Sequence, residues 1–213
     1  MSRHTMRMSY RLAICLLGAV GCFATFPAKA AEESPSPTKT AIFAGGCFWC
    51  MQPPYDKARG VVKTVVGYSG GSADDATYDK VSGHRTKHRE VIQVTYDPGQ
   101  ISYEQLLEIF WRNINPTQAD GQFHDVGLSY QAAVYYANDE EKKSAEASRE
   151  QLAKSGKFPR PIVTEILPIQ PFFPAEEYHQ KYYLKNPADY ELYHVGSGRV
   201  SFLEKIWGAV KKD

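Results

Sequence analysis

The chain has 213 residues, which is long enough for one domain with a sizeable core. Hydrophobic residues make up 43% and charged residues 23%, which is ordinary for a globular protein and excludes a disordered or fibrous chain. The formal net charge is +1. Without the first 30 residues, 21 basic and 24 acidic residues remain and the charge becomes −3, so we expect no nucleic acid partner.

Those first 30 residues have the pattern of a secretory signal peptide. Three arginines precede an apolar run of 15 residues, Leu12–Phe26, and Ala28-Lys29-Ala30 predicts cleavage after Ala30. A spanning helix needs about 20 mostly apolar residues, so a membrane anchor through an uncleaved signal is the weaker alternative. An anchor through a lipid-modified Cys22 is a second alternative. In each case we expect export, to the periplasm, where the folded part faces an oxidising space.

The same cleavage determines the cysteine content of the mature chain. Two of the four cysteines, Cys15 and Cys22, lie in the signal peptide. The mature chain then keeps only Cys47 and Cys50, which form a C-x-x-C pair. This pair therefore carries all of its thiol chemistry.

The rest of the chain alternates strand-like and helix-like patterns. Residues 31–39 form a Ser/Pro-rich linker, so we expect the folded domain to cover residues 40–213. The patterns predict strands at 41–44, 61–68, 88–96, 132–136 and 162–167. They predict helices at 47–58, 102–114, 138–156 and 175–184, and Ser102 with Gln105 is a capping-box pattern. This alternation favours an α+β fold, a two-layer sandwich with a mixed sheet and a ferredoxin-like core.

The most informative segment runs from Phe43 to Cys50. An apolar strand passes through Gly45-Gly46 into a cysteine that opens a helix. The glycines allow a tight turn, and the free N–H groups at a helix start stabilise a thiolate. Such positions can lower a cysteine pKa from about 8.5 to about 3.5–7.5. We therefore expect Cys47, at this strand-to-helix turn, to be a nucleophile and to have the lower pKa of the two thiols.

Three other interpretations of the cysteine pair compete with redox catalysis, and a second redox enzyme class is a further alternative. A structural bridge would close so short a loop that it restrains little of the unfolded chain. A zinc site needs four ligands, and only His84 and His88 are convenient additions. Haem attachment needs a histidine where the chain has Met51. A thioredoxin-like oxidoreductase is the strongest alternative, although such proteins usually have Gly-Pro between the two cysteines. This chain has Phe48-Trp49 there, and two aromatic side chains suit a pocket for a small apolar group.

The segment Gly46-Cys47-Phe48-Trp49 resembles the signature of the A-type peptide-methionine sulfoxide reductases, which act on the S epimer of the sulfoxide. Further segments similar to this family follow in the same order: Gly67–Gly71, Thr77-Tyr78, His88 with Glu90, Tyr96–Pro98, Phe110 through Thr117, Gly121–Phe123, Asp125 with Gly127, Tyr130 and Tyr178–Gln180. The similarity covers about residues 40–208. It implies a single reductase domain that is a monomer, uses no metal or organic cofactor and acts on methionine sulfoxide, free or in oxidised proteins.

The resemblance also implies roles for individual residues. Attack by Cys47 on a sulfoxide needs an acid that protonates the oxygen, and Glu90 matches that acid. An apolar site should favour its protonated form. Tyr78 and Tyr130 match the tyrosines that bind the oxygen. The other matches are Phe48 and Trp49, which hold the substrate methyl group, Asp125, which orders the site, and Tyr182, a pocket residue.

Attack would leave Cys47 as a sulfenic acid, with which a second thiol condenses to a disulfide. Cys50 is the only candidate, because relatives often carry a cysteine where this chain has His124, or near the C-terminus, where it has none. A thioredoxin-like donor would then reduce the Cys47–Cys50 disulfide. The chain departs from the family at Lys87 and Arg89, whose positive charge would lower the pKa of Glu90, but strand alternation predicts that they face away from it.

Overall fold

The computed structural model describes residues 37–208. The predicted signal peptide, its cleavage site and most of the predicted linker lie outside the described residues. Within residues 37–208, no helix combines the length and the apolar character that a membrane span requires.

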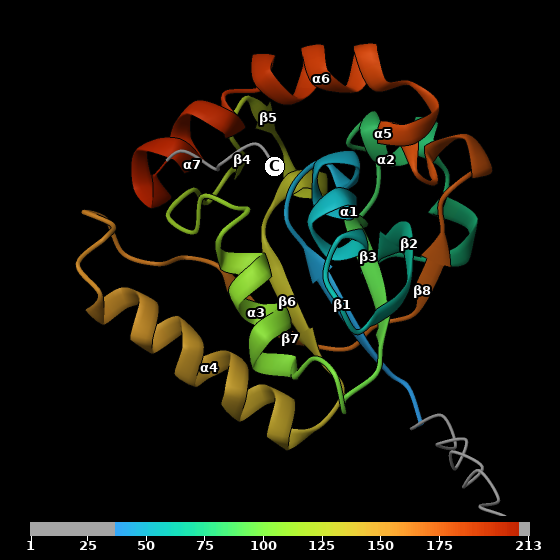
Figure 1. Cartoon of the computed structure of the whole chain (residues 1–213). Coiled ribbons are helices and arrows are strands. Elements are labelled where there is room, and N and C mark those ends of the chain that lie inside the picture. The colour runs from blue at the N-terminus through green and yellow to red at the C-terminus, as the bar shows by residue number, and fades with distance from the viewer. Residues whose placement is uncertain (1–36, 209–213) are drawn as a thin grey trace, which may run out of the picture. The chain divides into compact units, whose positions relative to one another are not determined.

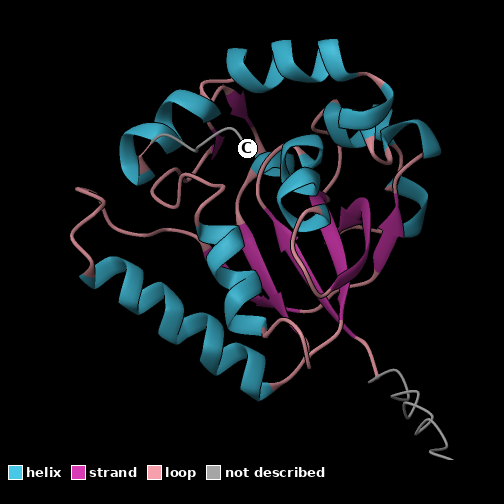
Figure 2. Cartoon of the chain, viewed as in Figure 1, coloured by secondary structure: helices cyan, strands magenta, loops and turns pink. Residues whose placement is uncertain are grey.

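A mixed sheet of six strands lies at the centre of the domain (Figures 1 and 2). Its strand order is β7-β6-β1-β3-β2-β8, in which β6 and β7 are parallel and the other neighbours are antiparallel. The strands are β1 (Lys39–Ala44), β2 (Val61–Ser69), β3 (Arg89–Tyr96), β6 (Ala133–Tyr136), β7 (Glu165–Pro168) and β8 (Phe172–Pro174). The short strands β4 (Gly121–Gln122) and β5 (Asp125–Val126) pair separately.

Three helices cover one face of this sheet: α1 (Phe48–Asp56), α3 (Tyr103–Trp111) and α4 (Asp139–Lys154). The succession β1-α1-β2-β3-α3-β6 is the βαββαβ order of a ferredoxin-like core. The predicted α+β fold with a mixed sheet is therefore confirmed. The other helical elements are η1 (Ala73–Asp75), α2 (Tyr78–Ser82), η2 (Leu128–Tyr130), η3 (Glu177–His179), α5 (Tyr182–Lys185), α6 (Pro187–Gly196) and α7 (Arg199–Trp207).

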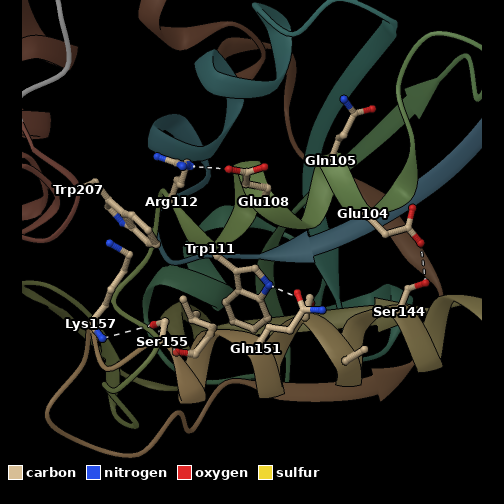
Figure 3. Close-up of a pocket in the computed structure, with 13 residues that line it drawn as sticks. Glu104, Gln105, Glu108, Trp111, Arg112, Ser144, Gln151, Ser155, Lys157 and Trp207 are labelled. Carbon is tan, nitrogen blue, oxygen red and sulfur yellow. Dashed lines mark hydrogen bonds and ion pairs between the residues drawn. The ribbon is translucent and has the colours of Figure 1, made fainter.

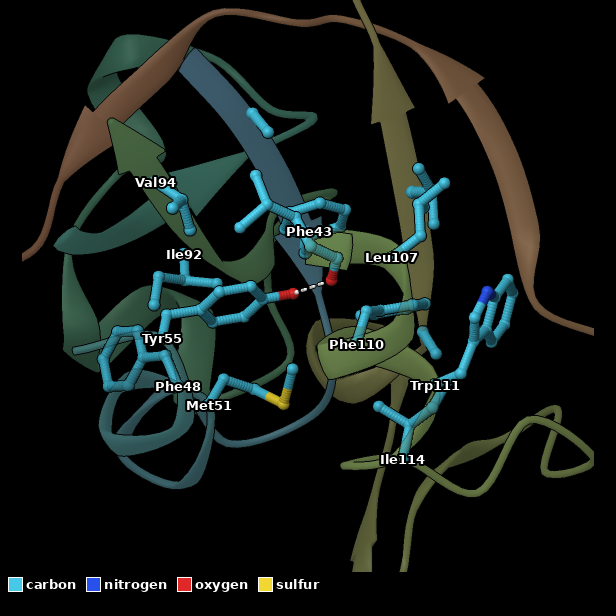
Figure 4. Packing of buried hydrophobic residues seen from close by; sticks show 14 of the residues in the cluster. Phe43, Phe48, Met51, Tyr55, Ile92, Val94, Leu107, Phe110, Trp111 and Ile114 are labelled. Atoms are coloured by element: carbon cyan, nitrogen blue, oxygen red, sulfur yellow. Dashed lines mark hydrogen bonds between the residues drawn. The ribbon is translucent and has the colours of Figure 1, made fainter. Parts of the chain in front are cut away.

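The core between the sheet and the helices fixes the position of α1 (Figure 4). The ring of Phe43, from β1, lies 5.4 Å from the ring of Tyr55 and 5.4 Å from that of Phe110. The Tyr55 hydroxyl donates a hydrogen bond of 3.2 Å to the carbonyl of Leu106 in α3. Full burial of a large apolar side chain contributes roughly 1.5–3 kcal/mol. The helix that carries the cysteines is thus anchored to both β1 and α3.

The predicted helix at 175–184 is wrong. The segment instead contains η3, a residue in the left-handed region, Lys181 (φ 55°), and the short helix α5. Tertiary contacts explain the break, because the Gln180 side chain bonds both the N–H (3.0 Å) and the carbonyl (2.9 Å) of Val66 in β2. The backbone N–H of Lys181 donates to Gln52 Oε1 in α1 at 2.7 Å. Helices α6 and α7 and strand β8 were not predicted.

Two predicted boundaries also differ from the structure. The strand expected at 162–167 begins only at Glu165, because the N–H of Val163 bonds the carbonyl of Pro116 at 2.8 Å and not the neighbouring strand β6. Helix α1 is shorter than the expected 47–58 and contains Pro53 and Pro54 after its first turn. Each proline removes one helical hydrogen bond, which is tolerated here because α1 is held by its packing.

Candidate active site

Cys47 lies at the predicted strand-to-helix turn. Strand β1 ends at Ala44, Gly46 adopts a φ of +80°, and Cys47 is the N-cap residue of α1. Cys50 lies in the first turn, where its N–H donates to the Cys47 carbonyl at 3.1 Å. Both cysteines are free thiols and are buried, with 5% of Cys47 and 1% of Cys50 exposed.

Gly46 is required for this turn on two grounds. Its φ is one that residues with a side chain rarely adopt, and an added Cβ would lie 2.5 Å from the Cβ of Gln122. Gly156, after α4, also has a positive φ (+70°), but an added Cβ there would meet nothing within 4 Å.

Gly46→Ala should therefore destabilise the protein more than Gly156→Ala does. Backbone strain of this kind costs about 1–3 kcal/mol, and at this chain length each kcal/mol lowers Tm by about 2–4 °C. Gly156→Ala should show the strain alone, whereas Gly46→Ala should add the steric clash. Thermal unfolding of both variants measures the difference, and equal Tm values would contradict the steric argument.

Glu90 lies beside the start of α1, on β3. Its side chain is 2% exposed, and its Oε2 accepts a hydrogen bond of 2.9 Å from the backbone N–H of Phe48. Burial raises the pKa of Glu90 well above its usual range; Cys47 and Asp125 raise it further, and the Phe48 N–H opposes the shift. Burial thus favours the protonated form of Glu90, which is the direction expected for an apolar site.

The basic residues next to Glu90 do not face it. Arg89 points to the opposite face of the sheet, where it pairs with Glu165 of β7 and donates to Gln131 at 3.2 Å. Lys87 precedes β3 and is exposed. The predicted alternation is confirmed for Arg89, and neither residue contributes to the pKa shift of Glu90.

Tyr78 and Tyr130 lie near Glu90 and Cys47, which act on the pKa of both tyrosines. Burial raises the pKa of Tyr78 to about 12, with Glu90 and Cys47 as the next contributions, and raises that of Tyr130 for the same reasons. Both hydroxyls are therefore protonated and can donate hydrogen bonds at neutral pH. The backbone N–H of Tyr78 is fixed by Glu176 Oε1 at 3.0 Å.

Tyr193 is a site residue that the sequence did not predict. It comes from α6, and its hydroxyl donates a hydrogen bond to Asp125 in β5. The same hydroxyl interacts with the Cys47 thiol and lowers its pKa. Asp125 thus orders the site through Tyr193. No motif marks Tyr193 in the sequence; its place among the tyrosines of the C-terminal segment was the only available signal.

The predicted pocket residues divide into two groups. Trp49 is half-buried and stacks on Tyr182, with ring centroids 4.0 Å apart and planes 9° apart. The Trp49 indole N–H also donates to His179 Nδ1 at 3.0 Å. Phe48 is different, because it is 1% exposed and packs against Tyr68 and His179. Its ring lies in the core and its backbone N–H bonds Glu90, and the role of the ring in holding the substrate methyl group stays a prediction.

The predicted order of the two thiol pKa values is also wrong. Burial raises the pKa of Cys47 well above its usual range, and the neighbouring Cys50 and Asp125 raise it further. The pKa of Cys50 is lowered, first by the hydrogen bond from Cys47 and then by the positive charge of Arg199 in α7. The helix start does not outweigh burial beside acidic groups, so the pKa of Cys47 is raised while that of Cys50 is lowered.

The zinc alternative finds no support in the histidines that it needed. His88 is buried, with Nδ1 accepting from the N–H of Gly71 at 3.2 Å and Nε2 lying 2.8 Å from the carbonyl of Ser72. His84 Nδ1 lies 3.2 Å from the hydroxyl of Ser129. Across residues 37–208, no cluster of three or more His, Cys, Asp or Glu side chains could hold a metal ion.

A separate groove of about 520 Å³ lies between α3, α4 and Trp207 (Figure 3). Trp111 lines it and donates its indole N–H to the Ser148 hydroxyl at 3.0 Å. None of the predicted site residues lines this groove. The groove is therefore separate from the candidate active site.

A buried thiol at a helix start, near a buried carboxyl group of raised pKa and two tyrosine hydroxyls on an α+β scaffold, is the arrangement of a thiol-dependent oxidoreductase. The family model described as Peptide methionine sulfoxide reductase matches residues 39–211. The chain belongs to this family. The predicted thiol-dependent reduction of methionine sulfoxide is therefore confirmed.

Individual relatives agree over most of the chain. The peptide methionine sulfoxide reductase MsrA of Bacillus subtilis (strain 168) is 53% identical over 169 residues, which cover 79% of this chain and 96% of that protein. The MsrA of Halalkalibacterium halodurans is 51% identical over 168 residues, 79% of this chain and 96% of that protein.

Two solved structures share the fold. Mxr1 from Saccharomyces cerevisiae in reduced form has a TM-score of 0.67 and 33% identity, covering 73% of this chain and 89% of that chain. Methionine sulfoxide reductase A of Corynebacterium diphtheriae has a TM-score of 0.63 and 32% identity, covering 73% of this chain and 77% of that chain. The α+β architecture is thus the one seen in solved members of the family.

Proposed function

We propose that the chain reduces the S epimer of methionine sulfoxide through a Cys47 sulfenic acid and a Cys47–Cys50 disulfide. The observation that carries this proposal is the placement of Cys47 at the start of α1, directly before the residue whose N–H holds Glu90. The acid and the nucleophile are thereby fixed to the same turn. Both free methionine sulfoxide and oxidised proteins are substrates in this proposal, and the enzyme acts as a monomer.

The first step combines proton transfer with attack on sulfur. Glu90 protonates the sulfoxide oxygen, which makes the sulfur electrophilic, and Cys47 attacks it. The hydroxyls of Tyr78 and Tyr130 donate hydrogen bonds to the oxygen as its charge changes. The oxygen is transferred to Cys47, which becomes a sulfenic acid, and methionine leaves. The indole ring of Trp49, which stacks on Tyr182, contacts the methyl group of the substrate.

The same buried environment explains how Cys47 can lose its proton. The interaction between the two thiols raises the pKa of Cys47 and lowers that of Cys50, so Cys50 can accept the proton of the nucleophile. Protonation of Cys50 at the moment of attack leaves Cys47 as the thiolate. Cys50 must then lose that proton again before it attacks the sulfenic acid.

Epimer-resolved turnover of a methionyl sulfoxide peptide with dithiothreitol tests the proposal. The S epimer should be consumed and the R epimer should persist. Exchange of protein disulfides without sulfoxide reduction would instead support a thioredoxin-like oxidoreductase.

In the catalytic cycle the disulfide is returned to the dithiol by a thioredoxin-like donor. Cys50 is half of that disulfide and is buried, so the donor has to reach the sulfur of one buried cysteine. Turnover supported by a reduced thioredoxin should stop when the donor's own attacking cysteine is replaced by serine.

We further propose that the protein is exported to the periplasm. Cleavage after Ala30 should give a mature protein that begins at Ala31, which intact mass spectrometry of the secreted species measures. A species that retains residues 1–30 would indicate a membrane anchor, and one that begins at a lipid-modified Cys22 would indicate a lipoprotein. Either result would contradict cleavage after Ala30.

A further inference from the structure

Cys50 contacts a histidine that the proposed reaction does not use. Nδ1 of His194, in α6, lies 3.3 Å from Cys50 Sγ, which is hydrogen-bond distance for sulfur. Cys50 is buried on α1, so His194 reaches it from an element near the other end of the chain. The thiol of Cys50 thus has two polar neighbours, Cys47 on one side and His194 on the other.

The ring of His194 is held in place within α6. It stacks on Tyr190, with ring centroids 5.2 Å apart and planes 17° apart. Burial lowers the pKa of His194 to about 4, and Arg199 lowers it as well. The imidazole is therefore neutral at neutral pH. In one tautomer Nδ1 can accept a hydrogen bond from the Cys50 thiol, and in the other it can donate one to the thiolate.

Arg199 supplies a fixed positive charge to the same region. Its side chain is 1% exposed and donates to the carbonyls of Gly45, at 2.9 Å, and Asn113. It forms no ion pair with any residue of the range 37–208. A buried cation without a carboxylate partner is costly unless another negative charge lies close. Arg199 lowers the pKa of Cys50, so a thiolate at Cys50 would supply that negative charge.

We propose that His194 is a positioning residue of the resolving step, which holds Cys50 as the thiolate that attacks Cys47 sulfenic acid, with Arg199 as its electrostatic support. A bond forms between the two sulfur atoms, and the S–O bond of Cys47 breaks. The oxygen leaves as hydroxide and takes up the proton that Cys50 gave up, so water is released. The sulfenic sulfur is the oxidant, and no other reactant is needed. This inference rests on the proposed function, in which Cys50 is the resolving thiol.

The remaining charged groups around the pair oppose the thiolate. Asp125 of β5 and Glu90 of β3 raise the pKa of Cys50, whereas Cys47 and Arg199 lower it. Glu191, on α6, raises the pKa of His194. Because these groups stay in place when His194 is replaced, loss of its hydrogen bond should move the pH dependence of disulfide formation to higher pH.

The test is a single turnover of S-methionine sulfoxide without reductant, in which methionine release and disulfide formation are followed separately. His194→Phe keeps an aromatic ring against Tyr190 and removes the contact with Cys50, whereas His194→Asn keeps an amide nitrogen near the position of Nδ1. Both variants should still release about one equivalent of methionine per enzyme molecule, because Cys47 carries out that step. Disulfide formation should slow roughly 10- to 100-fold in His194→Phe only, with its rate–pH profile moved to higher pH.

His124→Asn is the matched control, because His124 contacts the carbonyl of Gly196 at 3.0 Å and no cysteine. It should form the disulfide at the unchanged rate. A second measurement needs no mutation of His194. In the unchanged protein, the NMR resonance of His194 Nδ1 should shift as Cys50 titrates.

Three results would overturn the inference. The first is disulfide formation at the unchanged rate in His194→Phe, and the second is an equally slow rate in His194→Asn. The third is a His194 Nδ1 resonance that does not shift when Cys50 titrates. Unchanged protein that releases no methionine would instead overturn the proposed function, and the role of His194 with it.

Discussion

Cys47→Ser should abolish even the first turnover, whereas Cys50→Ser should still release about one equivalent of methionine per enzyme molecule. Cys47 is the N-cap residue of α1 and directly precedes Phe48, whose N–H holds Glu90. A serine hydroxyl at position 47 fits the same space and is not ionised at neutral pH, so it does not attack sulfur. Cys50 acts as a nucleophile only after methionine has left.

A single-turnover assay without reductant, followed by trapping of the sulfenic acid, measures both outcomes. In Cys50→Ser the sulfenic acid should persist until a small thiol is added. The amount of methionine is the readout, and not its rate of release, because the loss of Cys50 also removes the hydrogen bond that the two thiols share. If only Cys47→Ser released methionine, the roles would be reversed. If both variants cycled normally with the donor, neither thiol would be the catalyst.

The position of Cys47 could be predicted from the sequence because local signals determine it. The strand before it, the two glycines and the helix after it are all consecutive in the chain. Its pKa could not be predicted in this way, because the groups that raise it are burial and charges from other elements, such as Asp125 of β5. The helix start alone therefore gave the wrong order for Cys47 and Cys50.

The fold likewise has local features that could be predicted from the sequence and long-range features that could not. Ser102 and Gln105 form the predicted capping box, with hydrogen bonds of 3.2 and 2.8 Å, because both partners lie within one helical turn. The helix predicted at 175–184 fails, because Gln180 bonds the edge of β2 and Lys181 bonds α1. Contacts between distant segments outweighed local helix propensity there.

The C-terminal part of the site could not be predicted for a related reason. Tyr193 and His194 have ordinary neighbours in the sequence, and each acquires a role only when α6 packs over the start of α1. Tyr193 then reaches Asp125, and His194 reaches Cys50. The family resemblance located the residues that lie in its motifs, namely Glu90, Tyr78 and Tyr130, which the structure brings around Cys47.

Glu90→Gln should slow sulfoxide reduction by roughly 10²- to 10⁴-fold, the usual scale for general acid catalysis. The amide keeps an oxygen that can accept the hydrogen bond from the Phe48 N–H, so the start of α1 should stay in place. What the amide lacks is an acidic proton for the sulfoxide oxygen. Glu165→Gln is the matched control, since Glu165 pairs with Arg89 on the opposite face of the sheet and should leave the rate unchanged.

The pH dependence separates loss of the acid from loss of structure. Because burial raises the pKa of Glu90 in the folded protein, the carboxyl group stays protonated above the pH at which an exposed glutamate ionises, about 4.3. The rate should fall as pH rises through the folded pKa, and the residual rate of Glu90→Gln should lack that fall. The free energy of unfolding should depend on pH in the same direction. The contribution of protonated Glu90 to stability is complete below about pH 4.3 and is lost as pH rises through the pKa of Glu90 in the folded protein. Unfolding of Glu90→Gln should therefore depend less on pH over that range. A variant whose rate stays within about threefold of the unchanged protein at neutral pH would show that Glu90 is not the acid.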